Sequence, residues 1–204
     1  PSEGSYPIEQ DEQGTYVLNS RDLRLIEHLP ALIDAGLHSL KIEGRMKSIA
    51  YVATVVNAYR MALDAYAESM AEGQPYALPP ILLDELDKAS HRPYTTGFAL
   101  GVPPVDIQAT ASAGYIADAP IGAVVLAYDE KKGLAQIEQR NKFLDGDLLS
   151  ILSPGDVGRV FAVAGIWNEE GEKRQSTPHP REKLFIGCAE PLRPGDILRI
   201  IPKK

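Results

Sequence analysis

The first ninety residues alternate short strand-like runs with longer stretches in which apolar residues recur at helical spacing. Strands are predicted over 15–19 (TYVLN) and 37–44 (LHSLKIEG), where apolar runs are bounded by turn-forming residues. Helices are predicted over 21–36, 46–67 and 81–90, the first of which ends at a glycine. Strands that alternate with helices in this way are typical of parallel βαβ units.

Two βα units cannot close a sheet by themselves. They resemble the last units of a (β/α) barrel whose earlier strands precede them. We therefore expect the chain to be the C-terminal part of a longer protein. Pro30 falls within the first predicted helix and is expected to kink or split it.

The pattern changes after Tyr115, where short β-rich runs are separated by Gly, Pro, Asn and Asp. Runs such as IGAVVLAYD, GRVFAVAGIW and KLFIGCA predict a small antiparallel β-barrel. Residues 146–151 (GDLLSI) and 195–200 (GDILRI) nearly repeat each other. We interpret the repeat as the same Gly-Asp turn leading twice into a strand.

These patterns divide the chain into an α/β part and an all-β part. Residues 1–100 are predicted to hold the last βα units of a (β/α) barrel, and residues 112–204 the small antiparallel β-barrel. The segment 101–111 is rich in Pro and small residues. It is predicted to be an extended, exposed linker because its prolines remove backbone donors.

Composition argues against a membrane-spanning or disulfide-rich protein. With 44% hydrophobic residues in 204, the chain can bury a core, yet it has no run of about 18 apolar residues. The first residues are polar and lack the apolar centre of a signal peptide. One cysteine, Cys188, allows neither an internal disulfide nor a cysteine-ligated metal site. We therefore expect a cytoplasmic protein without membrane attachment.

The charge is unevenly spread and gives no broad basic surface. The net charge is −7, and residues 1–100 hold 8 Lys and Arg against 14 Asp and Glu. Tight non-specific binding of nucleic acid is therefore not expected. The loop 172–183 (EKRQSTPHPREK) is a local basic exception. Either it is a solvated loop or it contacts a polyanion.

Charged residues gather where the predicted strand 37–44 meets the next helix, in the stretch SLKIEGRMKS. Side chains alternate faces along a strand, so Lys41 and Glu43 are expected to face the barrel axis. Barrel enzymes place their chemistry at the carboxyl ends of strands, which makes Lys41 and Glu43 candidate catalytic residues. Arg45 and Lys47 follow beside the helix N-terminus and are candidate binding groups for an anion. The alternative is a buried Lys41–Glu43 ion pair with a purely structural role.

A second polar cluster lies in SHRPYTTGF, just after the third predicted helix. His91, Arg92 and Tyr94 are candidate substrate-binding residues, because a loop rich in donors that packs over a barrel mouth has this composition. A structured linker without a functional role explains the same pattern. The sequence shows no metal-ligand spacing, nucleophile elbow or Walker loop.

Beyond these patterns, the sequence resembles a known family. The stretch YVLNSRDLRLIEHLPALIDAGLHSLKIEGRMKSIAYVATVVNAYRMALD closely resembles peptidase family U32, the collagenase-like proteases, and SLKIEGRMKS is a specific signature of it. SHRPYTTGF, VVLAYDEKKGLAQIEQRNKFLDGD and RPGDILRI resemble the C-terminal region of that family. The resemblance implies a (β/α) barrel followed by a C-terminal β-barrel.

The resemblance leaves more than one activity open. The group with this architecture is similar to prephenate-dependent hydroxylases of the tRNA wobble uridine, which implies tRNA as a partner. Other members were described as peptidases, which are hydrolases acting on peptides, but these residues supply no Ser-His, Cys-His or zinc constellation. We favour tRNA modification for the full-length protein. A chain that is inactive alone and serves only as a binding module is the third alternative.

The resemblance also bears on cofactors and assembly. Related members bind an iron–sulfur cluster through cysteines upstream of the quoted motif, whereas this chain holds only Cys188. We therefore expect no cofactor in this chain and assign an iron–sulfur cluster to the N-terminal part of the full-length protein. A truncated barrel exposes apolar surface, so self-association through that face is expected.

Overall fold

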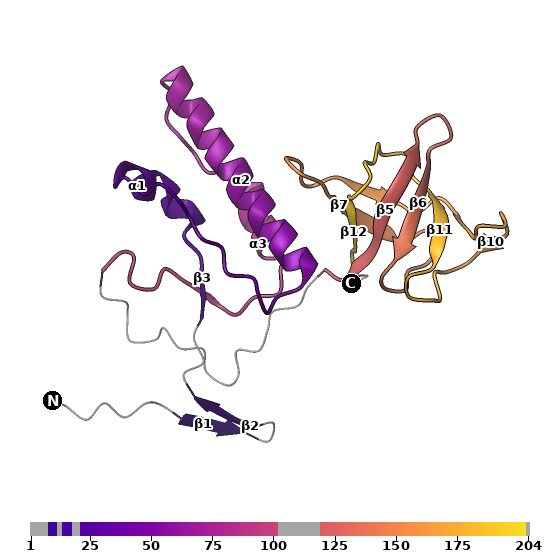
Figure 1. Cartoon of the computed structure of the whole chain (residues 1–204), viewed down its shortest axis with the longest axis horizontal. Helices are drawn as coiled ribbons and strands as arrows, with labels where there is room; N and C mark the ends of the chain where they lie inside the picture. Colours follow the sequence, from indigo (N-terminus) through magenta and orange to yellow (C-terminus); the bar gives the residue numbers. More distant parts are fainter. Residues whose placement is uncertain (1–7, 12–13, 18–20, 102–118, 203–204) are drawn as a thin grey trace. The chain divides into compact units, whose positions relative to one another are not determined.

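The computed structural model describes residues 8–11, 14–17, 21–101 and 119–202. The chain forms two compact units, which are described separately. Figure 1 labels helices and strands of both units. The units comprise Pro1–Leu40 with Ser90–Ala117, and Lys41–Ala89 with Asp118–Lys204.

The linker predicted over 101–111 lies, apart from Gly101, outside the described residues, and the predicted domain boundaries stay a prediction. Within the described ranges, no helix has both the length and the apolar character needed to cross a bilayer.

The first unit contains two small two-stranded sheets and a short helical segment. Its elements are β1 (Ile8–Asp11), β2 (Gly14–Val17), β3 (Asp22–Leu23), the 3-10 turn η1 (Ile26–His28), α1 (Leu29–Asp34) and β4 (Tyr94–Thr95). β1 and β2 form an antiparallel hairpin, whereas β3 pairs in parallel with β4.

Two predictions for this unit need correction. The strand expected over 15–19 forms part of an antiparallel hairpin rather than a parallel sheet, and its last two residues lie outside the described ranges. The helix expected over 21–36 is shorter, because β3 uses its backbone groups to pair with β4 and helical bonding begins only at Ile26. Pro30 lies in the first turn of α1, where its missing N–H breaks no helical bond, so it helps to start that helix.

The strand predicted over 37–44 does not form. Its residues lie in an irregular segment, and no strand among the described residues pairs with it. Leu40, expected to be covered by helices, is 37% exposed. A parallel strand depends on neighbours for its backbone hydrogen bonds, so an apolar pattern alone cannot hold 37–44 in a strand. The (β/α)-barrel arrangement is therefore not confirmed, and parallel pairing in the described chain occurs only between β3 and β4.

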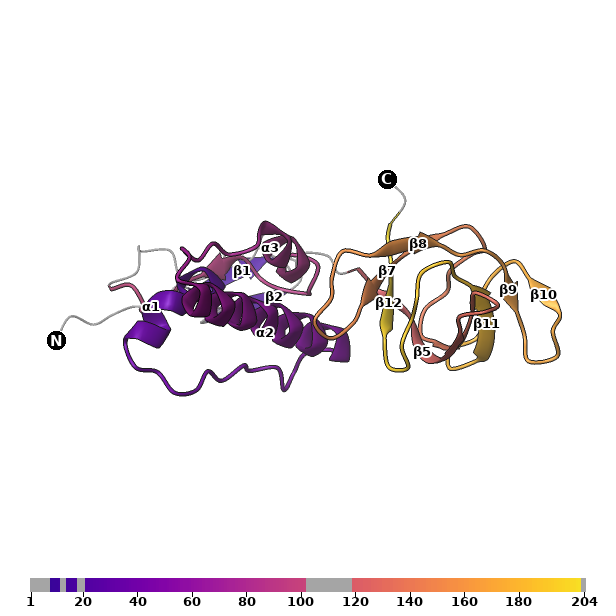
Figure 2. The ribbon, with the colours of Figure 1, turned by 90° about the horizontal axis from the view of Figure 1, so that it is seen from above.

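The second unit contains two helices that lie side by side, α2 (Ile49–Glu72) and α3 (Pro80–Leu86) (Figure 2). Ser48 caps α2, because its hydroxyl accepts a hydrogen bond from the Tyr51 N–H at 3.2 Å. The helix ends at Gly73, which adopts the left-handed conformation with φ 66°. Both helices were predicted from the sequence, and their ends are shifted by a few residues.

The rest of the second unit is a curled antiparallel sheet of eight strands in the order β10-β9-β11-β6-β5-β12-β7-β8 (Figure 1). The strands are β5 (Ile121–Asp129), β6 (Leu134–Gln139), β7 (Leu148–Leu152), β8 (Val160–Ala162), β9 (Ile166–Trp167), β10 (Lys173–Arg174), β11 (Lys183–Gly187) and β12 (Ile197–Ile200). Ile137, Phe143 and Leu184, each at most 1% exposed, belong to its apolar core. The predicted antiparallel β domain is confirmed. Its edge strands β8 and β10 do not pair with each other within the described chain, so the sheet curls without closing.

The near-repeat of GDLLSI and GDILRI forms two neighbouring strands, β7 and β12, which pair antiparallel. Gly146 and Gly195 have positive φ values of 84° and 94°. The aspartate after each glycine, Asp147 or Asp196, accepts a hydrogen bond at 2.8 Å from the backbone N–H three residues before it. The same Gly-Asp turn therefore enters both strands, as predicted.

A buried ion pair links the helices of the second unit to its sheet. Arg199 on β12 is 1% exposed, and its Nη2 donates to Glu85 Oε2 of α3 at 2.6 Å. Its Nη1 donates to Thr54 Oγ1 of α2 at 3.5 Å, and Lys88 pairs with the other oxygen of Glu85. Buried charges cost several kcal/mol unless each finds a partner, so these contacts hold α2 and α3 against β12.

Removing Glu85 should destabilise the second unit more than removing Arg199. Glu85→Leu leaves the Arg199 charge buried without its carboxylate, at an expected cost of about 3–5 kcal/mol in the free energy of unfolding. Arg199→Met leaves Glu85 with Lys88, so the expected cost is about 2–3 kcal/mol. Urea unfolding followed by the fluorescence of Trp167 measures both values. The double variant removes both charges and should be more stable than Glu85→Leu; equal or lower stability would contradict the coupling.

Candidate functional site

The predicted site residues are divided between the two units, and each group is described by itself. The second unit holds Lys41, Glu43, Arg45 and Lys47, and the first holds His91, Arg92 and Tyr94.

The first group lies in an exposed loop before α2. Lys41 Nζ is 3.6 Å from Glu43 Oε2, and the two side chains are 86% and 70% exposed. Glu43 Oε1 also accepts a hydrogen bond from the Arg45 N–H at 3.3 Å. Both side chains face solvent because residues 37–44 belong to no sheet that encloses them. In this chain Lys41 and Glu43 therefore do not face inward, and their catalytic role stays a prediction. So exposed an ion pair adds little to stability.

Arg45 and Lys47 are held differently in the same loop. Lys47 Nζ lies 4.8 Å from the ring centroid of Tyr51, a cation–π contact. The Lys47 N–H donates to Gly44 O at 3.0 Å, so this backbone group does not point to a bound anion. A Cβ on Gly44 would lie 2.8 Å from Val52 Cγ2, which explains why this turn needs a glycine. Arg45 is exposed, and its guanidinium is the group here best suited to bind a carboxylate or phosphate.

The second group is a packed cluster at the β3–β4 pair. His91 is 3% exposed and stacks on Tyr94, with centroids 4.0 Å apart and planes 8° from parallel. The guanidinium carbon of Arg24 lies 4.4 Å from the Tyr94 centroid. His91 Nδ1 lies 2.7 Å from Arg92 O and donates to it, because a carbonyl oxygen can only accept. Asp22 Oδ2 accepts the Arg92 N–H at 3.3 Å. The role of this cluster in substrate binding stays a prediction.

Sequence reasoning missed a groove of about 580 Å³ in the second unit. It is lined by the N-terminal half of α2, by residues 152–155 and by the turn before β12. Its α2 wall includes Ile49, Val52 and Val56, which are 75%, 37% and 46% exposed. The i, i+3, i+7 spacing of these residues is visible in the sequence. An apolar stripe facing a groove has the same pattern as one facing a core, so the sequence alone could not reveal it.

Asn57 holds the opposite wall of this groove in place. Its Oδ1 accepts the Gly155 N–H at 2.8 Å, and its Nδ2 donates to Ser153 O at 3.1 Å and to Asp156 O at 3.3 Å. The side chain therefore satisfies backbone groups of the turn between β7 and β8. No local pattern predicts a contact between residues this far apart in the sequence.

Cys188 does not fit a ligand of an iron–sulfur cluster. It is 2% exposed, and its thiol donates to Glu190 O at 3.2 Å. Burial raises the pKa of this thiol to about 11, whereas cluster ligands are thiolates. Among the described residues, no three His, Cys, Asp or Glu side chains are grouped so that they could hold a metal ion.

The raised pKa of Cys188 predicts slow alkylation of the native chain. Below pH 9 the thiolate fraction at a pKa of about 11 is roughly 100-fold smaller than at the ordinary value of 9.0. The iodoacetamide rate constant should therefore be about 100-fold lower than in urea-unfolded chain, and should rise roughly tenfold per pH unit. Mass spectrometry of the alkylated chain measures both rates. A native rate that levels off near pH 9 would contradict the shift.

Lys41→Ala should leave the stability of the second unit nearly unchanged. The Lys41–Glu43 pair is exposed, so the free energy of unfolding in urea should change by no more than about 0.5 kcal/mol. Asp64→Ala is a matched control, because Asp64 forms a similarly exposed pair with Arg60 at 2.6 Å. A loss above about 2 kcal/mol for Lys41→Ala alone would indicate the buried pair that the sequence predicted.

Comparison with known proteins assigns both parts of the chain. Residues 2–109 match Peptidase family U32, and residues 120–199 match the Peptidase family U32 C-terminal domain. The chain is 33% identical over 189 residues to "tRNA hydroxylation protein P1" of Bacillus subtilis (strain 168), covering 93% of this chain and 44% of that protein. It is 36% identical over 170 residues to "tRNA hydroxylation protein P" of Escherichia coli (strain K12), covering 83% of this chain and 36% of that protein.

A third relative carries a different name. The chain is 38% identical over 96 residues to a protein of Methanocaldococcus jannaschii named as an uncharacterized protease, covering 47% of this chain and 22% of that protein. The chain spans less than half the length of each of these relatives. The family match extends over more than half of the chain and includes the stretch SLKIEGRMKS. The chain belongs to peptidase family U32.

Proposed function

We propose that the full-length protein acts in tRNA modification as a hydroxylase of the wobble uridine, and that this chain is its C-terminal portion. The observation that carries the proposal is the identity of 33% and 36% to two proteins named for tRNA hydroxylation, over 93% and 83% of this chain. The similarity to these two proteins extends through nearly the whole chain, so it includes both the charged loop before α2 and the eight-stranded sheet. The wobble position is the finer part of the proposal and rests on the resemblance of the sequence motifs.

The proposal includes a (β/α) barrel that the remainder of the full-length protein completes. In this chain Leu40 is 37% exposed and residues 37–44 have no strand beside them among the described residues. Strands supplied by the rest of the protein would satisfy the backbone of 37–44 and cover Leu40. Lys41 and Glu43 would then face the barrel axis, where they are proposed as catalytic residues.

Arg45 is proposed to bind a small carboxylate donor at the mouth of that barrel. A guanidinium binds a carboxylate through two parallel hydrogen bonds, which fixes its orientation as well as its position. Lys47 adds a second positive charge on the same loop. His91, Arg92 and Tyr94 are proposed to contribute to substrate binding from the first unit.

Peptide hydrolysis is the second candidate function, because one relative is named as a protease. A peptidase that uses a side chain as nucleophile must activate it, often by lowering its pKa. The one cysteine of this chain shows the opposite effect, since burial raises the pKa of Cys188 to about 11. This observation argues against Cys188 as a nucleophile, and the names of the two relatives of greater coverage favour tRNA modification.

No cofactor is assigned to this chain. An iron–sulfur cluster needs thiolates outside these 204 residues, because Cys188 is the one cysteine here and is buried. A cytoplasmic location accompanies the proposal, since tRNA is the substrate. The exposed apolar residues Leu40 and Ile49 are proposed to support self-association when this chain is produced alone.

Arg45→Ala in the full-length protein should lower tRNA hydroxylation about 10–100-fold, the expected effect of losing a charge-assisted hydrogen bond to substrate. The melting temperature should stay unchanged because the side chain is exposed. Mass spectrometry of nucleosides, from tRNA of cells that depend on the variant, measures the modification. Arg60→Ala, which removes an exposed arginine on α2, is the matched control and should retain activity.

Two outcomes would count against these assignments. Normal hydroxylation by Arg45→Ala would show that Arg45 binds no substrate. Absence of hydroxylated uridine in cells with the wild-type protein, together with cleavage of a peptide library by the purified protein, would favour the peptidase.

A further inference from the structure

Two turns at one end of the sheet bring exposed cations together, although the chain has a net charge of −7. One turn is 138–142 (EQRNK), at the end of β6, and the other is 179–183 (HPREK), which leads into β11. They lie side by side because β6 and β11 pair antiparallel, with Lys183 opposite Glu138. We call these ten residues the cationic surface. Its exposed cations are Arg140, Lys142, Arg181 and Lys183, and its carboxylates are Glu138 and Glu182.

Hydrogen bonds hold both turns rigidly. The Arg181 N–H donates to Gln139 O at 2.9 Å, and the Gln139 N–H donates to Glu182 O at 3.0 Å. The Arg140 N–H donates to Gly122 O at 2.7 Å, which ties the first turn to β5. A surface whose backbone is already fixed loses less conformational entropy when it binds a partner.

Arg181 adopts a backbone conformation that costs free energy. Its φ is 66°, and it is the one non-glycine residue at positive φ in the described chain. It is the third residue of a turn with Pro180 second, closed by the Glu182 N–H donating to His179 O at 3.2 Å. Gly or Asn is the usual residue at this position. An arginine held there indicates a use for its side chain that offsets the strain.

Most charges of this surface are not neutralised by the protein. Lys142, Arg181 and Lys183 have no carboxylate within salt-bridge distance among the residues described. By contrast, Lys173 on nearby β10 lies 3.7 Å from Asp145. Exposed ammonium and guanidinium groups of this kind bind phosphates and release the counterions condensed on a nucleic acid.

We propose that the cationic surface contacts the phosphate backbone of tRNA. This inference rests on the proposed function and adds the place where the sheet holds the substrate. Contacts to phosphate position an RNA without reading its base sequence. A rigid surface of cations can make such contacts without any group that recognises a base. Because the chain as a whole is acidic, its binding to RNA depends on this surface and falls steeply with salt.

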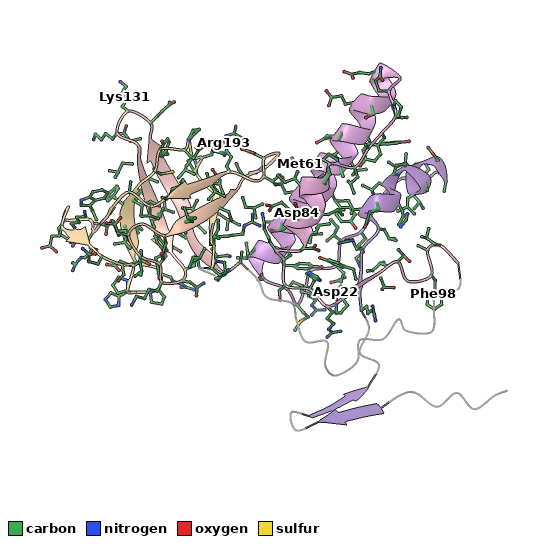
Figure 3. All side chains as sticks on the ribbon, turned by 180° about the vertical axis from the view of Figure 1, so that it is seen from behind. Asp22, Met61, Asp84, Phe98, Lys131 and Arg193 are labelled. Carbon is green, nitrogen blue, oxygen red and sulfur yellow. The ribbon has the colours of Figure 1, made fainter. Side chains whose placement is uncertain are left out.

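The test compares two double variants of the chain by the fluorescence anisotropy of labelled tRNA over a series of salt concentrations. Lys142→Ser/Lys183→Ser removes two cations of the surface. Its binding should be about tenfold or more weaker at low salt, and the slope of log K against log salt should fall by roughly 1–2. Lys131→Ser/Lys132→Ser is the control, because it makes the same charge change at the β5–β6 hairpin, at the other end of β6 (Figure 3). The control should lose much less affinity and keep its slope.

Arg181→Gly separates binding from folding. Glycine adopts positive φ without strain, so the melting temperature should be unchanged or higher. The affinity for tRNA should nevertheless fall, with a slope lower by about 1. A variant that binds as tightly as the wild type would show that Arg181 has only a structural role.

The outcomes distinguish this inference from the proposed function. Equal losses in the two double variants would mean that net charge, not this surface, drives binding, and would overturn the inference. Absence of any tRNA binding by the wild-type chain at low salt would also overturn it. Neither result concerns the modification itself, which the nucleoside assay on the full-length protein decides.

Discussion

The buried charge of Arg199 is the constraint on which the second unit depends. A guanidinium that is 1% exposed must be matched by a carboxylate, and Glu85 of α3 lies at 2.6 Å to meet it. Thr54 adds a contact from α2, and Lys88 neutralises the remaining charge of Glu85. One side chain on β12 thereby sets where both helices lie against the sheet. Its hydrogen bonds are directional, whereas apolar packing alone is not.

The contacts of Arg199 fix the position of α2, and α2 in turn positions the groove and the loop that carries Arg45. With α2 held by Arg199, Asn57 can satisfy three backbone groups of the turn between β7 and β8. The exposed apolar stripe of the same helix, Ile49, Val52 and Val56, then lines the groove, while Ala58 and Ala62 are buried. The charged loop that carries Arg45 comes directly before α2, so the capped start of this helix also limits where that loop can lie.

The functional proposals involve two separate surfaces, the loop before α2 and the cationic surface. The loop before α2 offers Arg45 for a small carboxylate, in a setting that depends on the rest of the full-length protein. The cationic surface offers charges on turns whose backbone is held by hydrogen bonds within this chain. A protein that modifies tRNA must hold a large polyanion and a small reactant at once, and the two surfaces are proposed to meet these two demands.

The sequence by itself determined the features whose physical causes are local. The helical spacing of apolar residues predicted α2, and the Gly-Asp repeat predicted two equivalent turns because positive φ and an aspartate acceptor are local needs. It could not decide which way Lys41 and Glu43 face, because alternation places a side chain inside only when neighbouring strands enclose it, and in this chain the pair is exposed. The sequence also could not predict the Arg199–Glu85 ion pair, because an arginine in a β pattern does not reveal which distant residue will pair with it. Only tertiary structure decides such cases, because the free energy of a buried charge or an unpaired strand depends on groups far away in the chain.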